Sequence, residues 1–253
     1  MVYATRMGLK DFLGLGGAEG KLRKHVARAK NKDAQSADRF SSLEALRDDG
    51  SPEAVLGLLG RFTIRYDKSI EDEQEKDFVF EELSRMGDSI LPQLSQHLRA
   101  ADSIAWGLKV LHAVAPKAEQ QWPILADLAE RNDNTYTRDP SRKIQLLSYL
   151  AELDDERCGT ALLPYLEDMD EGVRFTAVEG LLRHKLPAAR EPLLALLTND
   201  KEDSRRIKKR ILDGFADLAW DVKGFSGTVE KLIGDMLPGA RLDNQGKIKR
   251  AQK

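Results

Sequence analysis

Apolar residues recur at helical spacing along most of this chain, in short stretches separated by polar turns. The clearest stretch spans residues 158–184 and holds two apolar series: Leu162, Leu163, Leu166 and Met169, then Val173, Ala177, Val178, Leu181 and Leu182. Asp168, Asp170 and Gly172 separate the two series, and Asp170 is well placed to cap the second helix. The pattern predicts a helical hairpin, whose bare apolar face must stack on neighbouring hairpins.

The same pattern recurs, and a Pro–x–Leu triplet marks the first helix of four successive pairs. The triplets begin at Pro92, Pro123, Pro164 and Pro192, at intervals of 31, 41 and 28 residues. Without the polar insertion at 132–140 the unit is about 30 residues, in the range of helical arrays. A proline removes a backbone donor and crowds the preceding turn, so each should start or bend its helix.

This periodicity predicts an all-α fold, an α-solenoid of about six hairpins with a C-terminal capping helix. The six expected pairs span 21–48, 51–86, 88–114, 117–153, 156–184 and 188–219, and the capping helix spans 225–237. Residues 1–20 should be a flexible segment with a short amphipathic piece and a glycine joint at Gly14, Gly16, Gly17 and Gly20. The polar, basic tail 238–253 should be disordered. The solenoid domain itself is therefore expected to span 21–237.

Composition agrees with a soluble helical protein. The 253 residues are 41% hydrophobic and 6% aromatic, and they carry a net charge of −2. Cys158 is the single cysteine, which excludes an internal disulfide. No apolar run approaches the roughly 20 residues of a membrane span, and the start has no signal-type core. We therefore expect a cytoplasmic protein, and either Met1 or Met7 serves as its natural start.

At this point the chain resembles a known family. The run Leu163-Pro164, Asp168, Asp170, Val173-Arg174, Ala177 and Leu181 is similar to the HEAT repeat, in the short form shared with phycobilisome-lyase-like proteins. The resemblance covers about residues 36–220 and is strongest at 156–184. It implies an armadillo-like α-solenoid whose second helices line a concave face. It also implies that Arg174 pairs with an aspartate of the repeat turns, Asp168 or Asp170.

Residues that would indicate catalysis or metal binding are scattered. The four histidines fall in different repeats without a two-ligand spacing, and no His-Glu dipeptide of the HEAT-like deoxyhypusine hydroxylases occurs. The glycines at 14–17 lack the Gly-Lys-Ser/Thr ending of a phosphate loop. Cys158 reads as a passive thiol, and the carboxylates at 154–156 read as helix caps. We therefore expect no enzyme activity, no cofactor and no metal.

Charge alternates in sign along the array. Acidic residues dominate 67–82 and 152–171, whereas 21–32 and the tail are basic. The densest basic helix face is expected to hold a partner: Arg205, Arg206, Lys208, Lys209 and Arg210. Trp106 adjoins the buried positions of its helix and is a second candidate for partner contact, although core packing is the more common role at that spacing.

Three functions are open at this stage. The leading hypothesis is a non-enzymatic scaffold that binds another protein or peptide, possessing an acidic surface or segment, along its curved face. The alternative is nucleic-acid binding or DNA repair of the HEAT-like alkylpurine glycosylase type, with basic ends on phosphates and Trp106 or Trp122 against a base. A third is attachment to a membrane surface through Leu9, Phe12 and Leu13 with the basic run 21–32.

Overall fold

The chain divides into two compact units, residues 1–121 and 122–253. The computed structural model describes residues 9–66, 69–132 and 136–250, with the backbone alone at 9–16, 18, 69 and 132. Met1 and Met7, and the side chains of Leu9, Phe12 and Leu13, therefore lie outside the described part.

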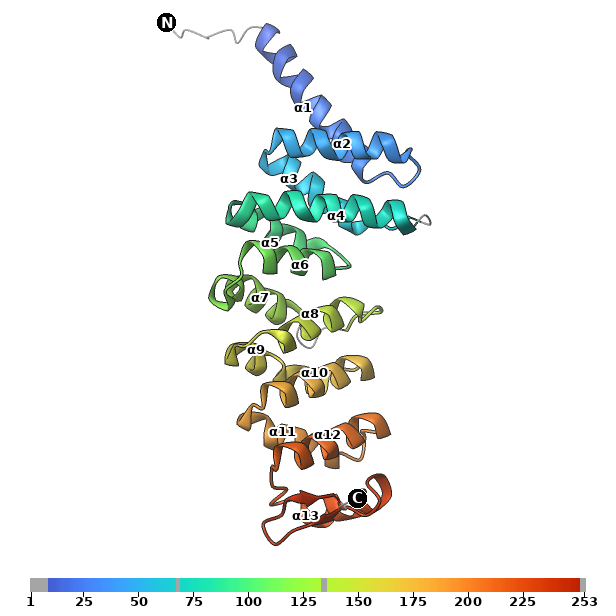
Figure 1. The fold of residues 1–253 in the computed structure, drawn as a ribbon, viewed down its shortest axis with the longest axis vertical. Helices are drawn as coiled ribbons and strands as arrows, with labels where there is room; N and C mark the ends of the chain where they lie inside the picture. The colour runs from blue at the N-terminus through green and yellow to red at the C-terminus, as the bar shows by residue number, and fades with distance from the viewer. Residues whose placement is uncertain (1–8, 67–68, 133–135, 251–253) are drawn as a thin grey trace, which may run out of the picture. The chain divides into compact units, whose positions relative to one another are not determined.

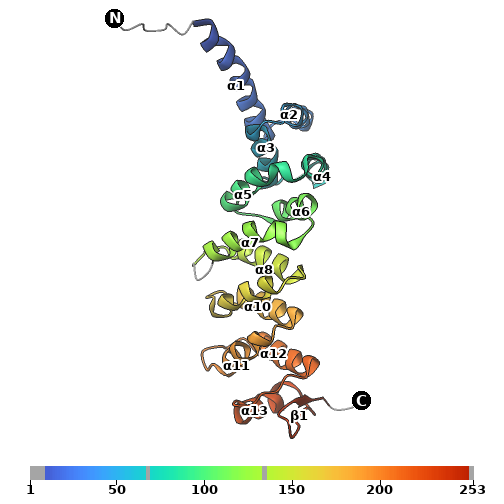
Figure 2. The ribbon, with the colours of Figure 1, turned by 90° about the vertical axis from the view of Figure 1, so that its left-hand side faces the viewer.

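The first unit is a stack of helical hairpins in two layers. Its elements are α1 (Leu9–Ala29), α2 (Ser36–Asp49), α3 (Pro52–Leu59), η1 (Gly60–Thr63), α4 (Ser69–Met86), η2 (Gly87–Ile90), α5 (Leu91–Ala100), α6 (Ala105–Val114) and the start of α7 (Ala118–Asn132). The first helices α1, α3 and α5 contact one another in sequence, and so do the second helices α2, α4 and α6 (Figure 2). Each hairpin therefore touches mainly its neighbours, as expected of a solenoid.

The second unit continues the same scheme (Figure 1). After the rest of α7 it contains α8 (Ser141–Glu152), α9 (Glu156–Ala161), η3 (Leu163–Glu167), α10 (Glu171–His184), η4 (Pro187–Ala189), α11 (Arg190–Thr198), α12 (Arg205–Leu218), α13 (Ser226–Met236), β1 (Arg241–Leu242) and β2 (Ile248–Lys249). The second helices α8, α10 and α12 pack in that order. The predicted all-α solenoid of helical hairpins is confirmed for the described residues.

The repeated apolar positions form the core between hairpins. On α10, every member of the second predicted series is at most 4% exposed: Val173, Ala177, Val178, Leu181 and Leu182. Asp170 caps this helix, because its Oδ1 accepts a hydrogen bond from the Val173 amide at 3.0 Å. Met169 differs from its apolar neighbours and is 79% exposed. The helical spacing is broken there because η3 ends at Glu167, two residues earlier.

The four repeat prolines act mainly at helix starts. Pro92 and Pro164 are the second residues of α5 and η3, and Pro192 is the third residue of α11. A proline in a first turn loses no helical hydrogen bond, since the first amides have no partner within the helix. Pro123 lies inside α7. At Pro164 the effect is strongest, because α9 ends at Ala161 and the chain resumes as a 3-10 helix.

Two glycines allow second helices to approach one another closely. A Cβ atom on Gly180 of α10 would lie 3.1 Å from the Cβ of Ala151 on α8. A Cβ on Gly214 of α12 would lie 2.5 Å from Cδ1 of Leu182 on α10. The first contact is tighter than most real Cβ contacts and the second is shorter than real Cβ atoms allow, so the close approach of α8, α10 and α12 depends on glycine at both positions.

The N-terminal segment differs from the sequence-based expectation. The glycine cluster at 14–20 lies inside α1, which runs unbroken from Leu9 to Ala29. Glycine lowers helix propensity by about 1 kcal/mol per residue without forbidding the helix. Packing of the second half of α1 on α2 and α3 favours the helical state there, with Ala29 fully buried.

The tail also differs from the expected disorder, because residues 241–249 form a hairpin. Arg241 pairs with Lys249 and Leu242 with Ile248. The Asp243 carboxylate accepts the amides of Gln245 and Lys247 at 2.9 Å, and Gly246 supplies a positive φ of 76°. Ile248 is 3% exposed and packs with β2 on α12. One apolar residue and one turn signal thus order a segment whose composition reads as disordered.

Replacement of Leu181 by alanine should destabilise the protein by roughly 2–5 kcal/mol, because the side chain is fully buried and its removal leaves a cavity. Urea denaturation measures the change in free energy of unfolding. Met169→Ala is the matched control, since Met169 is exposed and its truncation should change stability by less than about 0.5 kcal/mol. Equal losses in the two variants would contradict this assignment of the core.

Candidate functional site

The predicted basic face of α12 is occupied by acidic residues from neighbouring elements. Arg206 contacts Glu171 of α10 at 2.6 Å, and Arg210 pairs with Glu179 of α10. The other pairs are Arg205 with Asp235 of α13 at 2.9 Å and Lys209 with Asp213 of α12 itself at 2.7 Å. Lys208 lies half-buried on the same helix. The five basic residues thus share one helix, and the acids opposite them balance most of their charge.

A hollow of about 530 Å³ lies on the surface formed by the second helices α8, α10 and α12. Its uncharged lining residues include Leu182, Gly214 and Leu218. Charged residues of both signs line it: Glu152, Glu179, Arg183, Arg210 and Asp217. We call this surface the second-helix face. It contains Arg210, one of the basic residues predicted from the sequence to contact a partner, and it spans three successive repeats.

Glu152 of one repeat forms a bidentate ion pair with Arg183 of the next. Both Arg183 Nη atoms of α10 lie 2.6 Å from the carboxylate oxygens of Glu152 at the end of α8. The two side chains are 58% and 62% exposed. Exposed pairs contribute little to stability, typically less than about 1 kcal/mol. A molecule that binds here can therefore replace these contacts at small cost.

Arg174 pairs with a different acid from the one that the family resemblance implied. Its guanidinium donates to the Glu202 carboxylate at 2.8 Å and to the backbone carbonyls of Asp168 and Met169. The Asp168 carboxylate is already bound by buried Lys143, and that of Asp170 caps α10. Burial opposes the ionisation of Glu202, but the hydrogen bonds from Arg174 and from the Ser204 amide, together with the charges of Arg174 and Lys208, lower the pKa of its carboxyl. Arg174 therefore joins two repeat turns.

Trp106 contributes to aromatic packing in the first unit. Its ring stacks on Phe62 with a centroid distance of 5.3 Å and an interplanar angle of 5°, and it forms a T-shaped pair with Phe80 at a centroid distance of 6.3 Å. The Lys109 ammonium lies 4.3 Å from the ring centroid. Trp106 is half-buried, and these contacts occupy its ring faces. It lies in the first unit, whereas the second-helix face belongs to the second.

Nucleophile and metal chemistry find no support in the described residues. Cys158 is 1% exposed, and burial raises the pKa of its thiol to about 11, so it is protonated at neutral pH. Asp155 caps α9 by accepting a hydrogen bond from the Arg157 amide at 2.9 Å. Within residues 9–66, 69–132 and 136–250, no three His, Cys, Asp or Glu side chains are grouped in a way that would hold a metal ion.

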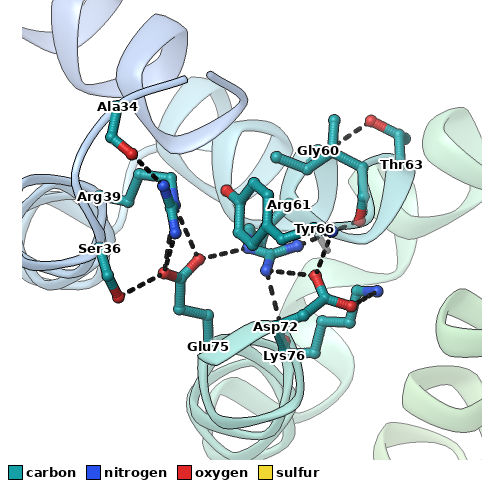
Figure 3. A network of polar contacts seen from close by, with 11 residues as sticks. Ala34, Ser36, Arg39, Gly60, Arg61, Thr63, Tyr66, Asp72, Glu75 and Lys76 are labelled. Atoms are coloured by element: carbon teal, nitrogen blue, oxygen red, sulfur yellow. Dashed lines mark hydrogen bonds and ion pairs between the residues drawn. The ribbon is translucent and has the colours of Figure 1, made fainter. Parts of the chain in front are cut away.

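A buried cluster of charged residues in the first unit was not anticipated from the sequence. Arg61 lies in η1, directly after α3, and is fully buried, and its Nε donates to Glu75 at 2.7 Å (Figure 3). Its Nη2 donates to the Asp72 carboxylate, also at 2.7 Å. Arg39 of α2 binds the same Glu75, with Nη2–Oε1 at 3.0 Å, and Lys76 binds Asp72 at 2.6 Å. We call these five residues the Arg61 cluster.

The Arg61 cluster joins α2, η1 and α4 around one tyrosine ring. The guanidinium carbons of Arg39 and Arg61 lie 3.7 Å and 4.3 Å from the ring centroid of Tyr66. Burial opposes the ionisation of Asp72, yet hydrogen bonds from Lys76 and Arg61 prevail and lower the pKa of its carboxyl. The Asp72 carboxyl is therefore ionised at neutral pH, and the cluster places charged side chains where an apolar core would otherwise lie.

His97 is a second buried polar group in the first unit. It is 8% exposed on α5, and its Nε2 has no hydrogen-bond partner among the described residues. Burial, assisted by the charge of Lys30, lowers the pKa of His97 to about 4. The imidazole is therefore neutral at physiological pH.

Loss of Arg61 should be strongly destabilising. In Arg61→Ala, two buried carboxylates lose their shared partner, and removal of one member of a buried ion pair costs roughly 3–5 kcal/mol. Urea denaturation followed by circular dichroism measures the change in free energy of unfolding. Arg65→Ala is the control, because Arg65 is exposed and lies four residues away. A loss below about 1 kcal/mol in Arg61→Ala would show that the cluster does not stabilise the fold.

Acid should destabilise the protein through His97. The pKa of His97 is 6.5 in the unfolded chain and about 4 in the folded protein. Between pH 6.5 and pH 4 the unfolded chain therefore binds a proton at this imidazole that the folded protein does not bind. The contribution is complete above pH 6.5 and falls by roughly 3 kcal/mol on descent to pH 4. A series of denaturation curves on wild type and His97→Leu measures the slope, which His97→Leu should lose. His112→Leu, at an exposed site, should retain it.

Comparisons with known proteins identify the repeat. A family model for HEAT repeats matches residues 123–209, from Pro123 in α7 to Lys209 in α12. The match does not separate out the phycobilisome-lyase-like form. No curated protein matches the chain, and no solved structure matches it. None of the described helices is both long enough and apolar enough to cross a membrane.

HEAT repeats generally serve as scaffolds for protein interaction and are typically not enzymes. The matched segment includes the hairpins α7/α8 and α9/α10 and most of α11/α12, which form the second-helix face. The match thus covers α8, α10 and the start of α12, and it ends just before Arg210, Gly214 and Asp217, which also line the hollow. Residues 123–209 of the chain are HEAT repeats.

Proposed function

We propose that this protein is a non-enzymatic scaffold that binds a partner protein along the second-helix face. The observation that supports the proposal most directly is the hollow of about 530 Å³ across α8, α10 and α12. Its lining combines uncharged residues such as Leu182 and Leu218 with charged residues of both signs, and protein interfaces likewise combine apolar and polar surface. Because three repeats contribute to it, an extended segment of the partner can contact each of them.

The charged residues beside the hollow determine the alignment of the partner and its rate of association more than its affinity. Glu152 and Arg183, and then Glu179 and Arg210, place opposite charges alternately along the face. A partner with the complementary order gains attraction only when it is correctly aligned. The contacts within the chain that it displaces are exposed ion pairs of small net stability.

The pairing of α12 also favours a protein partner over nucleic acid. A nucleic-acid surface needs cations that are free to neutralise phosphates. On α12 four of the five basic residues already contact carboxylates. A uniformly acidic partner would meet the same difficulty, so the partner we propose has charges of both signs.

Exchanging the two partners of one ion pair tests the proposal and keeps the ion pair itself. In the double variant Glu152→Arg, Arg183→Glu the pair can still form, but the order of charges presented to a partner is reversed. We expect unchanged thermal stability and at least a fivefold loss of partner recovery in a pull-down from the source cell, in line with charge-reversed interface contacts of about 1 kcal/mol or more. Glu19→Arg with Arg23→Glu, an exposed pair on α1, is the matched control.

Site-specific photo-crosslinking identifies the face that is occupied. A crosslinking amino acid at exposed Ser148, beside the hollow, should give discrete adducts with the partner. The same amino acid at exposed Ala195, on the first-helix side of α11, should not. Adducts at Ala195 with none at Ser148 would reject the second-helix face.

A further inference from the structure

The C-terminal tail completes a ladder of ion pairs that begins on the repeats. Glu152 pairs with Arg183, 31 residues later, and Glu179 pairs with Arg210, also 31 residues later. Asp217 pairs with Arg250, 33 residues later, with Nη1 at 2.9 Å from Oδ1. In each case an acid of one second helix receives an arginine from about one repeat length further along the chain.

The third arginine does not come from a repeat. Arg250 directly follows β2, and its Nη2 also lies 2.9 Å from Asp213 Oδ1 and 3.3 Å from the Asp213 backbone oxygen. It therefore binds both Asp213 and Asp217 of α12, at the end of the second-helix face where Asp217 lines the hollow. The tail supplies the arginine that another repeat would have provided.

Charge around the hollow shows what this arginine balances. Of the lining residues, Glu152, Glu179 and Asp217 are acidic, whereas Arg183 and Arg210 are basic, which leaves an excess of one negative charge. Arg250 neutralises that excess from outside the repeats. Asp213, beside it, is shared with Lys209 of the same helix at 2.7 Å.

The contact of Arg250 is suited to exchange. The side chains of Arg250 and Asp217 are 50% and 56% exposed, so neither is held by burial. The hairpin is anchored separately, by Ile248 at 3% exposure and by the Val222 amide on the Gly246 carbonyl at 2.8 Å. The arginine side chain can therefore leave Asp213 and Asp217 while the hairpin remains paired.

We propose that Arg250 is an internal competitor for an arginine of the partner protein, which binds Asp213 and Asp217 when Arg250 swings away. The inference rests on the proposed function and adds to it the chemistry of the partner, an arginine-bearing segment at the α12 end of the second-helix face. A guanidinium suits the site because it bridges two carboxylates with separate N–H groups.

Binding of a fluorescein-labelled hexa-arginine peptide to the full-length chain, followed by fluorescence anisotropy, tests the inference. Arg250→Ala should bind the peptide roughly two- to fivefold more tightly than Arg241→Ala, because loss of an exposed ion pair removes competition of that size. Arg241 is an exposed arginine of the same hairpin, so both variants change the net charge equally.

Two further variants locate the effect. Arg250→Ala combined with Asp213→Asn and Asp217→Asn should lose the gain in affinity, whereas Arg250→Ala with Asp203→Asn, an exposed acid of the α11–α12 loop, should keep it. Equal affinity of Arg250→Ala and Arg241→Ala would overturn the inference and leave Arg250 as a structural cap. That result would not affect the crosslinking from Ser148, so failure of the inference is distinguishable from failure of the scaffold proposal.

Discussion

Burial of apolar surface between successive hairpins is the interaction on which each unit depends. A hairpin such as α9/α10 has too small an interior of its own, and its leucines become fully buried only against the hairpins on either side. The helix ends, turns and caps arrange this burial. Glycines at 180 and 214 permit the close approach of α8, α10 and α12 that it requires.

Charge follows the same neighbour-to-neighbour rule. The acidic stretch 152–171 and the basic helix at 205–210 look like two separate patches in the sequence, but the structure pairs Glu171 with Arg206 across adjacent repeats. Opposite charges that are far apart in the sequence thus neutralise one another locally in the structure. In the first unit the rule extends to the interior, where the Arg61 cluster replaces apolar contacts between two hairpins. Such a cluster favours one arrangement of α2, η1 and α4, because its geometry must be satisfied in full.

The fold could be predicted largely from sequence because helical periodicity and repeated turn signals report on local structure. The six hairpins and the capping helix follow from them. What could not be predicted depends on contacts distant in sequence. Arg61 and Glu75 carry no helical signature that separates them from surface charges, and Arg174 finds Glu202 only because a turn of the next repeat brings it near. Likewise, Ile248 orders the tail through a contact with α12, whereas composition alone suggests disorder.

The hairpin that follows α13 has a consequence for how the array ends. A solenoid presents the interior of its last repeat to solvent, and an uncovered end is an adhesive surface for the end of another molecule. Here the terminal layer places Val222 and Ile248 inward, and Lys247 and Lys249 on the chain that crosses it. The two short strands are too brief to offer a long free edge to a neighbouring sheet. The side of α12 that faces β2 is thereby covered by a layer with buried Val222 and Ile248 inside and lysines on its outer chain.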